Sequence, residues 1–197
     1  MQLAWTIDDG ADADTLNAFL RMISATGTPM TFCPTHLFAQ HWEWSAPHLR
    51  MLIEQGRAQV VNHTWSHRTL TTLSDQEVRD EVQRNEDWIQ RTFGVTSRPW
   101  LRPPRGGWDE RVATLCGELG FTRMLLWDSS FGDASAISST ALMANARRAL
   151  FPGAIALGHA NAPTVTQHLD EILDLIRIRG LRPATLDQVF GTSRVVG

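Results

Sequence analysis

Hydrophobic residues along this chain fall into short, nearly continuous runs that are separated by longer stretches of mixed character. Strands that are buried on both faces of a parallel sheet have such continuous runs, whereas half-exposed strands alternate apolar and polar residues. The runs predict strands at residues 3–7, 30–33, 58–61, 100–102, 124–127, 154–157 and, more weakly, 181–186.

The longer stretches carry apolar residues at the spacing of amphipathic helices. Ser74, with Glu77 three positions later, forms a capping-box pattern that opens a helix reaching about residue 93. In the last stretch, one apolar stripe consists of Leu169, Ile172, Leu173 and Ile176. These patterns predict helices at residues 13–25, 74–93, 108–119, 138–150 and 165–179.

The alternation of strand and helix, seven times over, indicates a parallel sheet with crossover helices. No GxGxxG loop follows the first strand, so the pattern disfavours a dinucleotide-binding fold and favours a barrel or an incomplete barrel. No linker, low-complexity stretch or sequence repeat is evident. We therefore expect residues 1–197 to form a single α/β domain.

Composition and charge narrow the class of protein. Hydrophobic residues make up 43% of the chain and charged residues 20%, as in an ordinary globular protein. The net charge is -3, so no basic excess favours nucleic-acid binding. No apolar run is long enough for a transmembrane helix, and the N-terminus lacks the regions of a signal peptide. The compartment stays open between the cytosol and a site reached after removal of a leader.

Charged and imidazole side chains follow five of the predicted strands. Barrel enzymes place their functional groups at the carboxyl ends of the strands, so a shared position on the repeat indicates one common site. The residues that follow these strands are Asp8 and Asp9, His63 and His67, Arg102, Asp128 and Asp133, and His159.

The pair His63 and His67 has the i, i+4 spacing that places two imidazoles on one side of a helical turn. Alone, the histidines would be an exposed surface pair, and Asp8-Asp9-Gly10 would be a turn or a helix cap. On a shared rim, two imidazoles and one carboxylate suit Zn²⁺ or a similar divalent ion. Adjacent strand residues face different sides, so one carboxylate can bind the metal while the other reaches its water.

Arg102 ends an apolar strand and precedes two prolines that stiffen the segment. A surface arginine is the ordinary interpretation, but a rigid guanidinium here can hold a carboxylate that must stay ionised. His159 ends a wholly apolar strand. It is either a hydrogen-bonded core histidine or a general acid, since histidine is the side chain that titrates near neutral pH.

Five ordered motifs resemble those of the polysaccharide deacetylases, the NodB-like family 4 of carbohydrate esterases. They span nearly the whole chain and read TIDDG at 6–10, HTWSH at 63–67, RPPRG at 102–106, the segment 127–133, and LGH at 157–159. The resemblance implies an irregular, TIM-like (β/α)7 barrel. That fold agrees with the seven strands expected from the pattern.

The resemblance also implies a metal centre. Asp9, His63 and His67 would bind one divalent ion, with Zn²⁺ expected first and Co²⁺ or Ni²⁺ as alternatives. The RPPRG motif would line the substrate groove, and the backbone N–H near Arg105 would contribute to an oxyanion hole.

The same resemblance assigns the groups that move protons. Asp8 would be the catalytic base, steadied by Arg102. His159 would be the general acid, with Asp133 in the place of the residue that tunes it. Asp128 remains an alternative partner for His159, because the motif around Asp133 departs from the family pattern.

Five positions depart from that pattern. Ile7 and Ala11 replace a usual Phe and Pro and look tolerable, and Arg105 replaces a common Tyr, which can change how the substrate sits. Ser130 and Ala134 replace an Asp and a Trp in the fourth motif.

The chain has eight Trp and eight Phe but no Tyr. Flat aromatic rings suit the faces of sugars, or they pack loops onto the barrel. Four tryptophans fall in predicted loops or beside motifs: Trp42, Trp44, Trp65 and Trp108. Of these, Trp65 and Trp108 are the candidate substrate contacts, whereas Trp5 and Trp127 lie in predicted strands and are expected in the core.

The expected function is metal-dependent removal of N-acetyl groups from polysaccharide that contains GlcNAc, either chitin oligomers or peptidoglycan. Three alternatives use the same site: an O-acetyl xylan esterase, a cyclic amide hydrolase, and a catalytically dead pseudoenzyme that binds carbohydrate. The expected partner is an acetylated polysaccharide or oligosaccharide, with the protein a monomer and without nucleic acid. The substrate class favours the cell envelope or another extracytoplasmic location.

Overall fold

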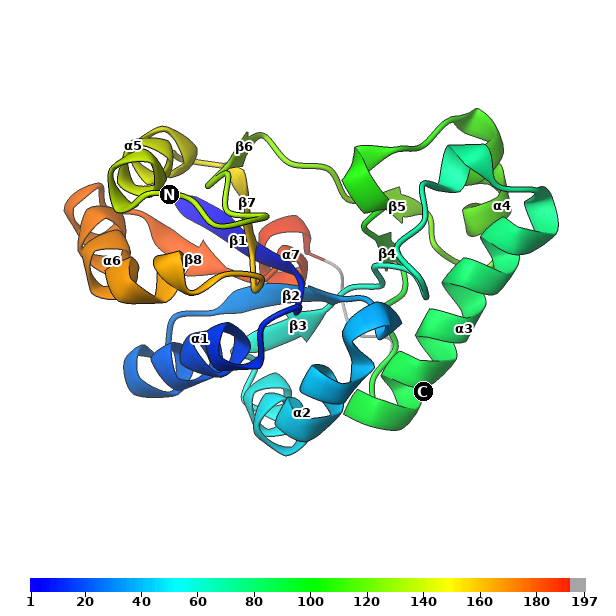
Figure 1. The fold of residues 1–197 in the computed structure, drawn as a ribbon, viewed down its shortest axis with the longest axis horizontal. Coiled ribbons are helices and arrows are strands. Elements are labelled where there is room, and N and C mark those ends of the chain that lie inside the picture. Colours follow the sequence, from blue (N-terminus) through cyan, green and yellow to red (C-terminus); the bar gives the residue numbers. More distant parts are fainter. Residues whose placement is uncertain (192–197) are drawn as a thin grey trace.

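The computed structural model, which describes residues 1–191, has a six-stranded sheet at its centre (Figure 1). Its strands are β1 (Gln2–Asp9), β2 (Met30–Pro34), β3 (Ala58–Val60), β6 (Ser129–Ser130), β7 (Ile155–His159) and β8 (Arg182–Ala184). All pairings are parallel, in the order β3-β2-β1-β7-β6, and β8 pairs with the first residues of β1. The expected α/β architecture with parallel strands is confirmed.

A second, smaller sheet consists of β4 (Trp100–Leu101) and β5 (Arg123–Met124), which are also parallel. A bridge between Asn62 and Leu101 links it to the chain that follows β3. Within residues 1–191, no strand pairing joins β5 to β6. The strands therefore follow a barrel that is open on this side.

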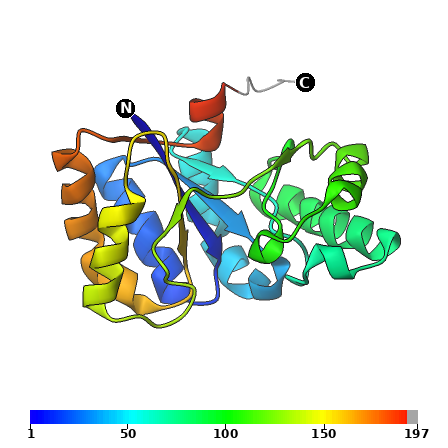
Figure 2. The same cartoon turned by 90° about the horizontal axis from the view of Figure 1, so that it is seen from above.

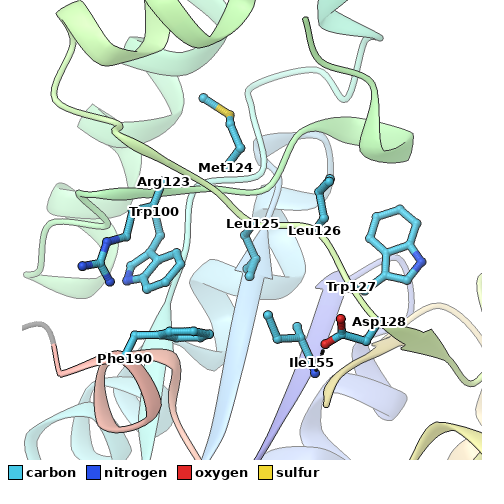
Figure 3. Close-up of a pocket in the computed structure, with 9 residues that line it drawn as sticks. All are labelled: Trp100, Arg123, Met124, Leu125, Leu126, Trp127, Asp128, Ile155 and Phe190. Carbon is cyan, nitrogen blue, oxygen red and sulfur yellow. Dashed lines mark hydrogen bonds between the residues drawn. The ribbon is translucent and has the colours of Figure 1, made fainter. Parts of the chain in front are cut away.

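The opening between β5 and β6 contains a pocket of about 510 Å³ (Figure 3). Residues 125–127, expected to continue the fifth strand, instead cross this opening together with Asp128. At one end the Leu125 N–H donates to the Leu101 carbonyl over 2.8 Å, and at the other the Asp128 N–H donates to the Ile155 carbonyl over 3.0 Å. The strand prediction was too long here because the apolar run continues beyond β5, past the residues that pair with β4.

Helices surround the strands, with α3, α4 and the smaller sheet on one side of the molecule (Figures 1 and 2). The helices are α1 (Ala13–Thr26), α2 (Ala39–Glu54), α3 (Asp75–Phe93), α4 (Glu110–Glu118), α5 (Ser139–Ala149), α6 (Leu169–Ile178) and α7 (Leu186–Phe190). The predicted helices are present, and the capping box of Ser74 and Glu77 opens α3. Helix α6 was predicted to start too early, at residue 165, because Pro163–His168 forms a 3-10 turn before it.

Helix α2 was not predicted, and its tryptophans were wrongly placed in a loop. Trp42 is fully buried on α2, while Trp44 on the same helix is 72% exposed. Pro47 lies inside the helix. Proline removes a backbone hydrogen bond and disfavours helix interiors, so it masked the helical spacing of the buried residues around it.

The core packs against β1, whose residues are buried from Leu3 onward. The Trp5 ring stacks on Phe131 with a centroid distance of 5.3 Å and meets Phe19 edge-on at 5.8 Å, as expected of a core residue. No helix within residues 1–191 combines the length and apolar character needed to cross a membrane.

Gly10 and Trp42 make a close contact that is testable through stability. Gly10 has a φ of +94°, and a Cβ there would lie 2.3 Å from Trp42 Nε1. Gly56 has a φ of +69° with no atom within 4 Å of such a Cβ, which makes it a matched control. We expect Gly56→Ala to lower the free energy of unfolding by about 1–2 kcal/mol through backbone strain.

Gly10→Ala should lower the free energy of unfolding by a further ~1–3 kcal/mol, because the Trp42 indole must move. Urea denaturation of both variants measures the difference. Equal losses in the two variants would contradict the tight contact between Gly10 and Trp42.

Candidate active site and metal centre

The carboxyl ends of the parallel strands bring the candidate residues together. β1 ends with Asp8 and Asp9, and the register pairs Asp8 with His159 at the end of β7. The chain after β3 supplies His63, whose N–H donates to the Pro34 carbonyl at the end of β2. Strands β1, β3 and β7 of one parallel sheet thus deliver their polar residues to the same rim.

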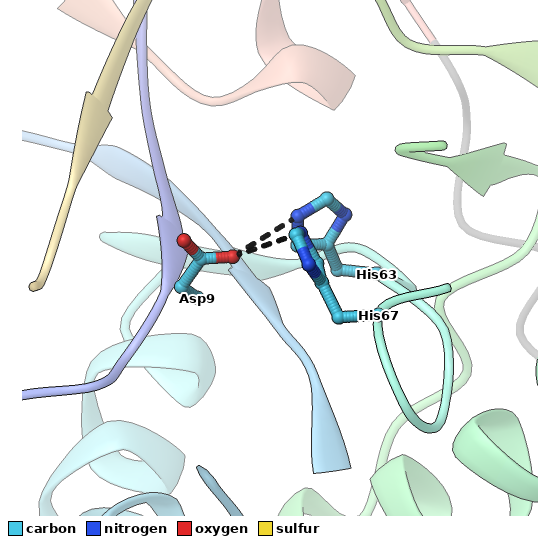
Figure 4. A group of neighbouring side chains, drawn as sticks. All are labelled: Asp9, His63 and His67. Atoms are coloured by element: carbon cyan, nitrogen blue, oxygen red, sulfur yellow. Dashed lines mark ion pairs between the residues drawn. The ribbon is translucent and has the colours of Figure 1, made fainter. Parts of the chain in front are cut away.

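Asp9, His63 and His67 form a group whose donor atoms lie within 4.8 Å of one another (Figure 4). Asp9 Oδ1 is 3.3 Å from Nε2 of His63 and 3.3 Å from Nε2 of His67. The same oxygen is buried and has no hydrogen-bond donor. Two ligands of a tetrahedral zinc ion, each about 2.1 Å from the metal, lie roughly 3.4 Å apart. The donor set and its spacing therefore fit a divalent ion.

The second ring nitrogen of His63, Nδ1, is fixed by a backbone hydrogen bond. His63 Nδ1–H donates a hydrogen bond to the Arg102 carbonyl over 2.7 Å, and Nε2 is left facing Asp9. Such a contact fixes the tautomer of a metal-binding histidine. Burial, together with the neighbouring His63, lowers the pKa of His67 to about 4, so this ring is neutral and ready to bind at pH 7.

Backbone strain is concentrated in this site. Among residues 1–191, the non-glycine residues with positive φ are Asp9 (71°), Thr64 (67°), His67 (57°) and Arg105 (56°). Each such conformation costs on the order of 1–3 kcal/mol and persists only where the surroundings enforce it. All four residues belong to the motif segments around the candidate metal centre.

Buried polar side chains enforce the shape of the loop at 63–67. The Asn62 side chain accepts the Thr64 N–H over 2.9 Å and donates to the Val82 carbonyl of α3 over 2.9 Å. Glu81, also on α3, accepts the N–H of Ser66 over 2.8 Å and the hydroxyl of the same residue. Helix α3 therefore holds the loop that presents both histidines.

Asp8 and Arg102 form a buried ion pair beside the histidines. Arg102 is fully buried, and its Nη1 lies 3.2 Å from Asp8 Oδ2, while its Nη2 donates to Thr6 Oγ1 over 3.0 Å. The Asp8 carboxylate is 3.6 Å from His63 Nε2. The other Asp8 oxygen is buried without a hydrogen bond. Asp8 thus lies next to the metal group but is held by a different residue.

His159 is paired with Asp133, whereas Asp128, the alternative partner, binds a backbone N–H instead. His159 Nδ1 is 3.0 Å from Asp133 Oδ1, whereas the Asp128 carboxylate accepts the Ile155 N–H over 2.8 Å. Burial alone would lower the pKa of His159. The Asp133 hydrogen bond and the charge of Asp8 outweigh it, so the pKa is raised above its ordinary value.

The aromatic residues near the site differ from expectation. Trp65 stacks on His36 with centroids 3.3 Å apart and has the Arg84 guanidinium 4.2 Å from its ring, so it is already engaged by protein groups. Trp108 is 42% exposed and precedes α4. Trp127 was predicted to be in the core, but it is half-exposed because the chain there crosses the open side of the barrel.

Arg105 and Trp127 border the site. Arg105 Nη1 donates to Thr69 Oγ1 over 3.1 Å and lies 3.4 Å from the His67 carbonyl, so the guanidinium is tied to the loop that carries the two histidines. The Trp127 ring has the Arg102 guanidinium 5.5 Å from its centroid. A Cβ at Gly106 would lie 3.0 Å from this ring.

The sequence pattern places Asn161 near the end of the sixth predicted strand, but no role was assigned to it. Its side chain donates to Asp9 Oδ2 over 2.7 Å, although it lies 152 positions away along the chain. It follows β7 directly after the motif that contains His159. Its position at a strand end was the one signal that could have indicated it.

Comparison with known proteins places this architecture in a family. The model of the polysaccharide deacetylase family matches residues 2–124. The peptidoglycan-N-acetylglucosamine deacetylase of Bacillus cereus is 25% identical over 197 residues, which cover 98% of this chain and 70% of that protein.

Solved structures share the fold. A T48 deacetylase solved with substrate has a TM-score of 0.84 and 25% identity, with 98% of this chain and 92% of that chain covered. A CE4 family pseudoenzyme from Bacillus anthracis has a TM-score of 0.83 and 21% identity, with 95% of this chain and 64% of that chain covered. The match to the family model over more than half of the sequence, together with these relatives, shows that the chain belongs to the polysaccharide deacetylase family.

Proposed function

We propose that this member of the family is a metal-dependent N-deacetylase of polysaccharide that contains GlcNAc, either chitin oligomers or peptidoglycan. The observation that carries the proposal is the position of Asp8. Its carboxylate lies 3.6 Å from a nitrogen of the Asp9, His63 and His67 group, yet it is bound by Arg102 rather than by that group. A base next to a metal-binding triad suits the hydrolysis of an acetyl group.

Asp9, His63 and His67 would hold one divalent ion, with Zn²⁺ proposed first and Co²⁺ or Ni²⁺ as alternatives. When bound, such an ion polarises the acetyl carbonyl and makes its water more acidic. Two imidazoles and one carboxylate leave coordination positions open for water and substrate. The orphaned Asp9 Oδ1 supports this assignment, because a buried acceptor without a donor is costly unless a cation is near.

The proton transfers are assigned to two side chains at the ends of neighbouring strands, Asp8 on β1 and His159 on β7. Asp8 would take the proton of the attacking water, and the ion pair with Arg102 holds its carboxylate in place. His159, held by Asp133, would deliver a proton to the leaving amine. The backbone N–H of Arg105 would help to stabilise the oxyanion.

The substrate assignment extends to the surroundings of the site. The exposed Trp108 would contact a sugar face, and the Arg105 side chain would border the groove. The Trp65 ring is stacked on His36 and has the Arg84 guanidinium over it, so we propose that it contacts the sugar through the edge of the ring. A polymer substrate favours the cell envelope, and we propose that the protein acts there as a monomer.

Acetate release tests the function and its metal dependence. We expect chelated protein to release no acetate from chitin oligomers or peptidoglycan, and Zn²⁺ or Co²⁺ to restore release. His63→Ala should abolish both metal binding and activity, whereas His48→Ala on α2 should leave both unchanged. Bound metal without acetate from either polymer would shift the assignment to O-acetyl xylan or a cyclic amide. Absence of activity on all of these would indicate a pseudoenzyme that binds sugar.

Asp8→Asn separates the base from the metal ligands. We expect this variant to keep stoichiometric zinc, because Asp9 and the two histidines are intact, and to lose turnover by roughly a hundredfold or more. Elemental analysis and acetate release measure the two quantities on the same sample. An Asp8→Asn variant with normal turnover would remove Asp8 as the base.

Asp133→Asn tests the acid through its pH dependence. Asp133 raises the pKa of His159, so the protonated ring persists to higher pH in the native protein. Removing the carboxylate charge should lower this pKa and move the alkaline limb of kcat/KM to lower pH. The loss should therefore be larger at pH 8 than at pH 6, and smaller for an activated aryl acetate, whose leaving group needs little protonation. A uniform loss at every pH would mean that Asp133 only orients the ring.

A further inference from the structure

Asn161 contacts three different parts of the site with one side-chain amide. Nδ2 donates to Asp9 Oδ2 over 2.7 Å and to the Ala134 carbonyl over 3.2 Å. Oδ1 accepts the Ala11 N–H over 3.2 Å. The opposite amide orientation would place an oxygen against two acceptors and an NH₂ group against a donor, so the three partners define the orientation.

The two oxygens of Asp9 consequently have different surroundings. Oδ2 accepts a hydrogen bond from the side-chain N–H of Asn161. Oδ1 has no hydrogen-bond donor and lies 3.3 Å from Nε2 of both His63 and His67. Only Oδ1 is thus presented to the metal-binding group.

We propose that Asn161 is a positioning residue that makes Asp9 a one-oxygen metal ligand and thereby sets the coordination number of the bound ion. This inference rests on the metal centre of the proposed function. A carboxylate that is free to rotate can bind a cation through both oxygens, which would use a position needed by water or substrate. The amide prevents this by holding Oδ2 in a hydrogen bond.

The same amide connects the two halves of the site. Ala134, whose carbonyl it binds, directly follows Asp133, the partner of His159. Ala11 begins the turn that follows Asp9 and Gly10. Asn161 therefore ties the metal ligand on β1 to the loop that carries the partner of the proposed acid.

Metal binding to Asn161→Ala tests the inference without any measurement of activity. The zinc affinity is determined by competition with a chromophoric chelator, and the coordination by the visible spectrum of the Co²⁺-loaded protein. We expect the zinc affinity to fall ten- to a hundredfold, as for other groups that orient a ligand. We also expect the Co²⁺ bands to weaken, because a two-oxygen Asp9 raises the coordination number and cobalt absorbs less at higher coordination.

Asn145→Ala is a matched control. Its amide also donates to a backbone carbonyl, that of Phe131, over 2.9 Å, but it makes no hydrogen bond to Asp9. This variant should keep the wild-type zinc affinity and Co²⁺ spectrum. Asn161→Ser provides a second test in a folded protein if the alanine variant is unstable, since its short hydroxyl leaves Oδ2 free.

The outcomes separate this inference from the proposed function. Wild-type affinity and spectrum in both Asn161 variants would overturn it, and so would a fall in affinity with an unaltered Co²⁺ spectrum. If the native protein itself binds neither Zn²⁺ nor Co²⁺, the proposed metal centre fails and the inference falls with it.

Discussion

The fully buried Arg102 is the residue on which the geometry of the site depends. Its side chain binds Asp8 and Thr6 of β1. Its backbone N–H donates to the Asn62 carbonyl, and its backbone carbonyl accepts a hydrogen bond from the His63 ring. One residue thus fixes the proposed base and one metal ligand relative to each other. A buried carboxylate that loses such a partner typically destabilises a protein by about 3–5 kcal/mol, so fold and site are coupled here.

The site also stores conformational strain that the rest of the fold supports. Asp9 and His67 of the candidate metal group, and Thr64 and Arg105 beside it, all adopt left-handed backbone conformations. Helix α3 holds the histidine loop through Glu81 and the carbonyl of Val82, and the indole of Trp42 donates to the Asp9 carbonyl over 2.7 Å. Packing of the helices around the sheet therefore contributes directly to the placement of the proposed ligands.

The sequence predicted the α/β fold with parallel strands and indicated which polar residues lie together, but not the full course of the chain. The acidic and imidazole residues at strand ends meet because parallel strands in register end at one rim, as with Asp8 and His159. Local pattern missed α2, where Pro47 hides the helical spacing, and misplaced Trp127, whose exposure depends on the barrel staying open. The strand-end position of Asn161 indicated the rim, but its hydrogen bond to Asp9 depends on side-chain geometry that the sequence pattern does not contain.

The proposed function requires that Asp9, His63 and His67 bind one metal ion beside Asp8. Anomalous X-ray scattering at the zinc edge, from crystals of the native chain grown with Zn²⁺, tests it most directly. We expect one zinc peak about 2.0–2.2 Å from Asp9 Oδ1 and from Nε2 of both histidines. A crystal with zinc bound elsewhere and no peak at these three atoms would contradict it.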